Sequence, residues 1–184
     1  MTILVLIISF GASFVLFLIA MTVHEFAHGL VAYKLGDSTA KLSGRLTLNP
    51  LAHIDPFWTI ILPLVLFIST AGRFVFGAAK PVPVNYWSLK NPKRDMIWIG
   101  LAVPLANFIL AFMIAGILRL IPSSGISASL LFNLLTINVV LAVFNLIPIP
   151  PLDGSKIFMG LLPAQLSQLY AWFERYGFII LFVF

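Results

Sequence analysis

The sequence predicts an all-α polytopic membrane protein: a bundle of about three to four transmembrane helices with a re-entrant segment and a small β element at the membrane surface. Of the 184 residues, 61% are hydrophobic and 9% charged, whereas a soluble domain is charged at about a quarter of its positions. The mean hydropathy is +1.08, and apolar runs of membrane-spanning length recur along the chain. We expect residues 1–184 to form a single intramembrane domain.

The charges and the absence of cysteine limit the classes of function. Eleven Lys and Arg residues against six Asp and Glu give a net charge of +5, spread between the apolar runs. This distribution favours loops that face the cytoplasmic surface of a lipid bilayer, and it argues against nucleic-acid binding. Because cysteine is absent, no thiolate can bind a metal ion, and the remaining candidate ligands are three histidines, four aspartates and two glutamates.

The first element is a long helix that ends in ionisable residues. Residues 3–23 contain no ionisable side chain over 21 positions, enough to cross a hydrocarbon core of about 30 Å. The motif HEFAH follows at once. On a helix His24 and His28 share one face and can bind one metal ion, while Glu25 projects beside them. Ionisable groups at membrane depth cost roughly 2.5 to 3.5 kcal/mol each, which favours a metal site over a polar surface turn.

The next segment, residues 37–55, is predicted to lie at the membrane surface. Loose alternation over residues 42–48 favours a short strand or hairpin. His53 and Asp55 are candidates for a third metal ligand. We favour a structural role instead, in which they hydrogen-bond and cap the start of the next helix.

A short apolar run then predicts a re-entrant path. Residues 57–69 are only 13 in number and contain Pro63, and a run of this length more often turns back than spans. Glycine and alternating prolines favour an extended path over residues 74–84. Residues 86–95 form a polar, basic surface loop.

Two clear spans follow, of 25 residues at 96–120 and 21 residues at 127–147. Unpaired amides are costly in hydrocarbon, so the polar face of the second span should point into the bundle, with Asn133, Asn138 and Asn145. Aromatic residues predict an interfacial helix at 165–176. The eight residues 177–184 are too short to cross and suggest a truncated final span.

Asp153 is the most informative residue after the HEFAH motif. It follows the second span and three prolines, and it could cap a helix that begins at Gly154. A carboxylate is an expensive cap where Ser or Thr would serve, which favours a metal ligand instead. With His24 and His28 it would complete three protein ligands and leave the fourth tetrahedral position to water, as in catalytic zinc sites. We therefore expect one Zn2+ ion per chain.

Several sequence blocks carry a family resemblance: HEFAHGLVAYKLGD, GRLTLNPLAHIDP, AKPVPVN, VPLAN and FNLIPIPPLDGSKI. Together they resemble the site-2 protease family of intramembrane zinc metalloproteases, in its small form without a PDZ domain. The resemblance implies a general base, Glu25, and a set of zinc ligands: His24, His28 and Asp153. It also implies substrate-binding roles for two amides, Asn145 and Asn107.

The implied substrate is a transmembrane segment of another protein, which must unwind locally before its carbonyls can react. An open edge of the predicted strand at 42–48 would hold the unwound segment by strand addition. Two other classes of function use the same residues. One is a zinc transporter or metal-sensing membrane protein, which needs the ligands but not Glu25. The other is a catalytically silent relative that acts as a membrane binding module, and an intact ligand set and base make it the weaker alternative.

The position of the motif also predicts the path through the membrane. The histidines lie near the end of the first helix, so Asp153 must reach the same side, and residues 56–84 must go in and come back. Eight Lys and Arg residues then lie on that side, against Arg73 and Arg119 on the other. By the positive-inside rule the site faces the cytoplasm, and we expect the cell membrane as the location.

Overall fold

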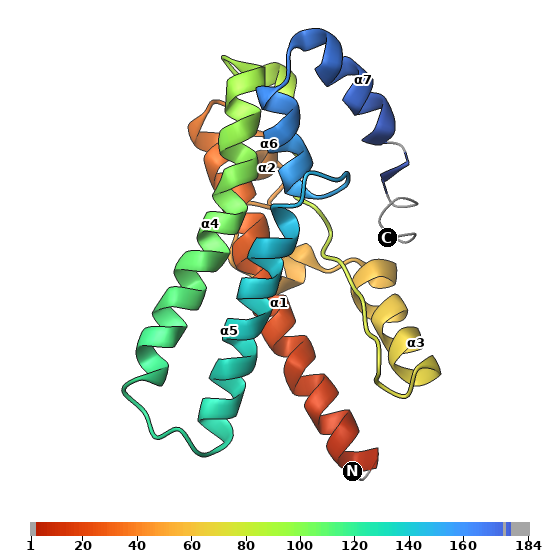
Figure 1. Ribbon diagram of the computed structural model, residues 1–184, viewed down its shortest axis with the longest axis vertical. Helices are drawn as coiled ribbons and strands as arrows, with labels where there is room; N and C mark the ends of the chain where they lie inside the picture. The colour runs from red at the N-terminus through yellow and green to blue at the C-terminus, as the bar shows by residue number, and fades with distance from the viewer. Residues whose placement is uncertain (1–2, 175, 178–184) are drawn as a thin grey trace.

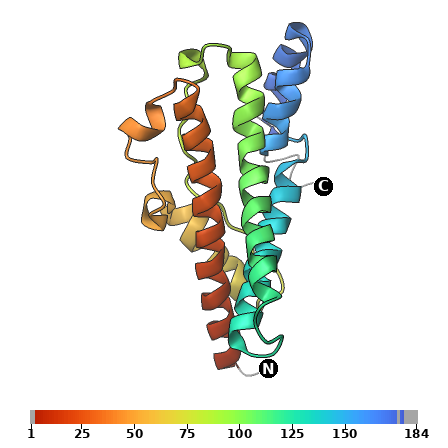
Figure 2. The same ribbon diagram turned by 90° about the vertical axis from the view of Figure 1, so that its left-hand side faces the viewer.

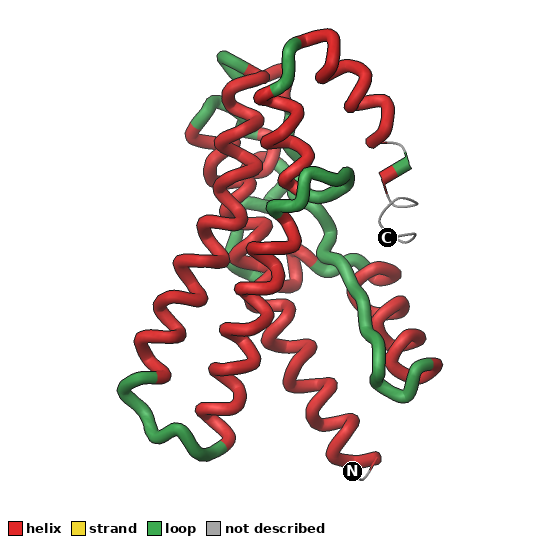
Figure 3. The backbone as a smooth tube through the Cα atoms, in the orientation of Figure 1, coloured by secondary structure: helices red, strands yellow, loops and turns green. Residues whose placement is uncertain are grey.

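The computed structural model describes residues 3–174 and 176–177. Over these residues the secondary structure is helical, without strands (Figure 3). The main helices are α1 Ile3–Lys34, α2 Thr39–Leu42, α3 Leu62–Ser69, α4 Pro92–Leu118, α5 Ile126–Asn145, α6 Asp153–Leu161 and α7 Ala164–Glu174. Short helical turns lie at Pro50–His53, Pro56–Ile61 and Tyr86–Ser88.

Three helices, α1, α4 and α5, are long and apolar enough to cross a membrane. They correspond to the predicted spans, although α4 begins four residues earlier than residue 96 because Pro92 occupies its first turn. Polar side chains of these helices are buried while apolar ones face outward: Asn107 and Asn138 have no exposed surface, and Phe112 is 81% exposed. An interior that is more polar than the exterior suits a lipid environment, and the chain is an integral membrane protein.

The long helices pack as a bundle in which α4 contacts α1, α5 and α6. Figures 1 and 2 show α1 and α4 side by side over the upper part of the molecule, with α6 against α4. The C-terminal end of α1, the start of α4 and the helices α6 and α7 lie at one end of the molecule (Figure 1). The N-terminus, the turn between α4 and α5 and the tip of α3 lie at the other end.

The segment that contains α3 extends away from the bundle and then folds back alongside the same helix. Asp55 caps the helical turn Pro56–Ile61 at the start of this segment, because its side chain accepts hydrogen bonds from the N–H groups of Phe57 and Trp58, both at 2.9 Å. This confirms the predicted cap. After α3 the chain takes the predicted extended path back along the helix (Figure 1), and the N–H of Ala78 donates to the carbonyl of Trp58 at 3.1 Å.

The predicted strand or hairpin at 42–48 is wrong. Asp37 accepts a hydrogen bond from the N–H of Thr39 at 2.9 Å, and the chain turns into the single-turn helix α2. Gly44, with φ +69°, ends that turn, and the N–H of Arg45 donates back to the carbonyl of Ala40 at 2.8 Å. A glycine in the left-handed conformation with such a bond is a helix-stop signal, which the alternation of leucines concealed. The strand edge expected to hold a substrate is therefore absent.

The last described helix, α7, carries exposed apolar side chains, including Leu169 at 59% and Trp172 at 48% exposure. The helix covers most of residues 165–176, and its position at the membrane interface stays a prediction. The predicted truncated span at 177–184 falls outside the described residues, except for Gly177.

Candidate metal centre

The C-terminal half of α1 supplies three buried ionisable side chains. His24, Glu25 and His28 are 5%, 5% and 6% exposed. The two imidazole rings lie on one face of α1, with their centroids 5.6 Å apart. This is the arrangement that the HEFAH spacing predicts for an α-helix.

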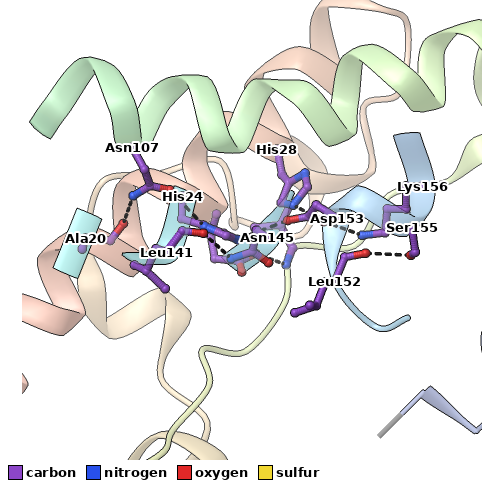
Figure 4. A network of polar contacts seen from close by, with 12 residues as sticks. Ala20, His24, His28, Asn107, Leu141, Asn145, Leu152, Asp153, Ser155 and Lys156 are labelled. Atoms are coloured by element: carbon purple, nitrogen blue, oxygen red, sulfur yellow. Dashed lines mark hydrogen bonds and ion pairs between the residues drawn. The ribbon is translucent and has the colours of Figure 1, made fainter. Parts of the chain in front are cut away.

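Asp153, the first residue of α6, meets the two histidines from the opposite end of the chain (Figure 4). Its Oδ1 lies 3.0 Å from Nε2 of His28, and its Oδ2 lies 3.4 Å from Nε2 of His24. The carboxylate is 4% exposed and makes no cap to its own helix. The predicted ligand set thus converges in space, and the alternative that Asp153 is an N-cap is wrong.

Two glycines allow this approach. A Cβ at Gly154 would lie 2.4 Å from the backbone oxygens of both Leu146 and Ile147, so α6 can start against the end of α5 only with glycine there. On the other side, a Cβ at Gly100 of α4 would lie 3.1 Å from the carbonyl oxygen of Asp153. Close backbone packing on both sides therefore fixes where the carboxylate stands.

Lys156 adds a positive charge to the same carboxylate. Its Nζ lies 3.0 Å from Oδ1 of Asp153, one helical turn further along α6. Burial raises the pKa of Asp153, but the charges and hydrogen bonds of His28, His24 and Lys156 outweigh burial and hold the pKa well below its usual range. Burial lowers the pKa of Lys156, and the Asp153 carboxylate more than reverses this and raises it. The site therefore holds an ionised carboxylate.

The outer nitrogen of His24 is held by an amide. Nδ1 of His24 lies 3.2 Å from Oδ1 of Asn107, which comes from α4 (Figure 4). An amide oxygen only accepts, so the proton of a neutral His24 sits on Nδ1 and the Nε2 lone pair faces Asp153. A lone pair and a carboxylate oxygen, both acceptors, are then directed at each other. Two acceptors repel each other at this distance, and a cation bound between them would remove the repulsion.

The donor set fits a zinc ion. One ligand atom from each of His24, His28 and Asp153 can be chosen so that all three lie within 4.8 Å of one another. Tetrahedral zinc with bonds of about 2.0 to 2.1 Å separates its ligand atoms by about 3.3 to 3.4 Å. The contacts of 3.0 and 3.4 Å between the carboxylate and the imidazoles are close to that separation. Two imidazoles and one carboxylate leave one position open, as in catalytic sites.

Glu25 is held beside this cluster by the extended segment that follows α3. Its Oε2 accepts a hydrogen bond of 2.7 Å from the N–H of Val82. The residues on either side of Val82 are prolines, which have no N–H of their own. The extended segment thus positions the carboxylate for which the family resemblance implies the role of general base.

The remaining predicted residues have different surroundings. Asn145, the last residue of α5, is 9% exposed and donates from Nδ2 to the carbonyl of Leu141 at 2.9 Å (Figure 4). Asn107 has no exposed surface, and both ends of its amide are hydrogen-bonded. These bonds connect Asn107 to His24 and Asn138, and the substrate-binding role that the resemblance implies for Asn107 stays a prediction. His53 and Asp55 lie outside the cluster. Asp55 caps the next helical turn as predicted, whereas Nε2 of His53 contacts the carbonyl of Thr47 and not the start of that turn.

Two residues of the site were missed by sequence reasoning. Lys156 follows Asp153 at the helical spacing i to i+3, a signal that was available. Asn138 was expected only to face into the bundle. Its Oδ1 accepts a hydrogen bond of 2.8 Å from Nδ2 of Asn107, so Asn138 is connected to His24 through Asn107.

A helical membrane protein with a buried cluster of two histidines and one aspartate beside a glutamate has the donor set of a metal-dependent hydrolase. Comparisons with known proteins agree. The model of peptidase family M50 matches residues 120–184. YwhC of Bacillus subtilis is 41% identical over 175 residues, which cover 90% of this chain and 76% of YwhC. Rip2 of Mycolicibacterium smegmatis is 32% identical over 168 residues, covering 90% of this chain and 63% of Rip2.

A more distant relative, named zinc metalloprotease MJ0392, comes from Methanocaldococcus jannaschii. It is 25% identical over 156 residues, which cover 85% of this chain and 36% of the relative. No solved structure matches the chain. The identity to YwhC over most of both proteins shows that the chain belongs to peptidase family M50, the site-2 protease family. The predicted family is thereby confirmed.

Proposed function

We propose that this protein is an intramembrane zinc metalloprotease that hydrolyses peptide bonds within or near transmembrane segments of other membrane proteins. The observation that carries the proposal is the buried meeting of His24, His28 and Asp153 beside Glu25, inside a bundle of membrane-spanning length. Membership of peptidase family M50 supports the reaction class. The relatives YwhC and Rip2 are both named putative zinc metalloprotease, and MJ0392 is named zinc metalloprotease, which supports zinc as the metal.

In this proposal each side chain has a separate task. His24, His28 and Asp153 would hold the zinc ion, which when bound would supply Lewis-acid chemistry and lower the pKa of a water molecule towards about 7. Glu25 takes the proton of the attacking water and later delivers it to the leaving amine. The hydrogen bond from the N–H of Val82 fixes the orientation of the Glu25 carboxylate. Asn145, a buried amide at the end of α5, would donate to the substrate backbone.

The burial of the site favours a membrane-embedded substrate. A transmembrane helix shields its carbonyls in i to i−4 hydrogen bonds, so the substrate must unwind locally before Glu25 can act on it. The polar interior of the bundle can receive the exposed peptide groups that hydrocarbon would reject. We therefore assign the protein to regulated intramembrane proteolysis.

The test is cleavage of a tagged single-span protein co-expressed with the chain, compared between the wild type and Glu25→Gln. Glutamine keeps the size of the side chain but cannot take a proton, so we expect full zinc content and a loss of cleavage of roughly 100-fold or more. Zinc transport in proteoliposomes that persists in Glu25→Gln, without cleavage by the wild type, would contradict the proposal.

The proposed path places the site on the cytoplasmic side of the cell membrane, with residues 56–84 entering and leaving on that side. The descent of α3 and the extended return beside it support this path. Single cysteines in this cysteine-free chain provide the test. We expect Ser88→Cys to be labelled only from the cytoplasm and Ser124→Cys only from outside. Labelling of both from one face would overturn the path.

A further inference from the structure

Two buried amide side chains form a hydrogen-bonded chain that ends at Nδ1 of His24. Asn107 on α4 and Asn138 on α5 are both 0% exposed. Nδ2 of Asn138 donates to the carbonyl of Leu134 at 2.8 Å, and its Oδ1 accepts from Nδ2 of Asn107 at 2.8 Å. Oδ1 of Asn107 then faces Nδ1 of His24 at 3.2 Å. Three separate helices thus contribute to one line of hydrogen bonds.

This line has a fixed direction. The carbonyl of Leu134 can only accept, so it sets the NH2 group of Asn138 towards itself and the oxygen of Asn138 towards Asn107. That oxygen in turn draws the NH2 group of Asn107, which also faces the carbonyl of Ala20 at 3.4 Å. The oxygen of Asn107 is therefore the atom left for His24.

The direction decides which nitrogen of His24 is available to a metal. With an acceptor at Nδ1, a neutral imidazole carries its proton there and keeps the Nε2 lone pair free. Without that acceptor the proton can move to Nε2 and be donated to Oδ2 of Asp153, which is 3.4 Å away. The ligand position would then be closed by a hydrogen bond.

We propose that Asn107 and Asn138 form a relay of positioning residues that fixes the tautomer of His24 and keeps Nε2 ready for the metal. The inference rests on the proposed function, in which His24 is a zinc ligand. His28 shows the contrast, because its Nδ1 is buried without a hydrogen-bond partner among the described residues. The relay therefore acts on one of the two histidines.

The experiment reads the tautomer directly. The chain has three histidines, so 15N-histidine labelling gives few signals, and removal of one histidine at a time assigns them. Metal-free protein in micelles is measured near pH 9, above the ordinary histidine pKa of about 6.5. We expect the proton of wild-type His24 on Nδ1. In Asn138→Leu we expect the proton to shift towards Nε2, and zinc affinity, measured by chelator competition, to fall roughly 10- to 100-fold.

Two variants of the same helix separate a relay from general packing. Asn138→Asp keeps an oxygen at position 138 that accepts from Nδ2 of Asn107, so we expect a His24 tautomer near that of the wild type. Asn133→Leu makes the same chemical change as Asn138→Leu but breaks a bond to Ser13, 2.9 Å in length, outside the relay. It should leave the His24 tautomer unchanged.

The outcomes distinguish the relay from an effect of packing and from a failure of the proposed function. A wild-type His24 protonated on Nε2 overturns the relay without any variant being made, and so does an unchanged tautomer in Asn138→Leu. An equal shift in Asn133→Leu also overturns it, because the effect would then come from packing. If the wild type binds no zinc but His24 carries its proton on Nδ1, the proposed function fails while the relay stands.

Discussion

Two regions of the molecule contain histidine and aspartate, and the fold uses them in opposite ways. His24 and His28 turn their Nε2 atoms to Asp153, a residue that arrives from the far end of the chain. His53 instead turns Nε2 to the nearby carbonyl of Thr47 at 2.9 Å, and Asp55 accepts from the first N–H groups of the next helical turn. A metal site needs acceptors that converge while remaining free of local backbone partners.

The largest expected effect removes a converging ligand. Asp153→Ala leaves two imidazoles without the carboxylate, so the purified protein should fall from about one zinc ion per chain to a small fraction of that. His24→Ala and His28→Ala should each have the same effect. Zinc is measured by elemental analysis against protein concentration.

His53→Ala is the matched control for these variants, because His53 is equally buried, at 2% exposure, but belongs to the local region. It should keep its zinc and lose only stability. The contrast between the two regions would be refuted by an Asp153→Ala protein that keeps zinc while His53→Ala loses it.

A smaller effect is expected from the glycine that lets Asp153 approach. In Gly154→Ala the new Cβ would meet the backbone oxygens of Leu146 and Ile147 at 2.4 Å. Backbone cannot move aside as a side chain does, so α6 should shift and the protein should lose about 1 to 3 kcal/mol of stability. Displacement of the carboxylate should weaken zinc binding roughly tenfold or more, measured by chelator competition.

Gly11→Ala provides the comparison, because a Cβ at Gly11 of α1 meets nothing within 4 Å. It should leave zinc affinity unchanged and stabilise the helix slightly. Equal zinc affinity in Gly154→Ala and Gly11→Ala would show that close packing of α6 does not position Asp153.

The sequence predicts the ligand set because strong local patterns carry it. The i, i+4 spacing places His24 and His28 on one face, and the lack of cysteine narrows the third ligand. The three long helices follow from apolar length. The surface strand failed because the left-handed Gly44 and the hydrogen bond from the N–H of Thr39 to Asp37 outweighed a weak alternation over residues 42–48.

The positions of Asn107 and Asn138 could not be predicted in the same way. Helices α4 and α5 are apolar on nearly every side, so hydrophobic periodicity does not define their rotation about their own axes. The contact of Asn107 with His24 depends on that rotation and on the relative depth of three helices. The amides of α5 predict which side of that helix faces the bundle, but a single sequence contains little information on the relative depth of the helices. The substrate-binding role that the resemblance implies for Asn107 stays a prediction.

The smallest expected effect concerns the local region. Asp55→Ala removes the acceptor of two backbone hydrogen bonds, from Phe57 and Trp58 at 2.9 Å. Loss of such a cap costs about 0.5 to 2 kcal/mol, which should appear as a lower melting temperature in detergent. Asp55→Asn keeps an acceptor oxygen and should melt near the wild type. Both variants should retain zinc, because Asp55 lies outside the cluster formed by His24, His28 and Asp153. Zinc loss in Asp55→Ala at temperatures where the protein remains folded would mean that the two regions are coupled through α3 and its extended return.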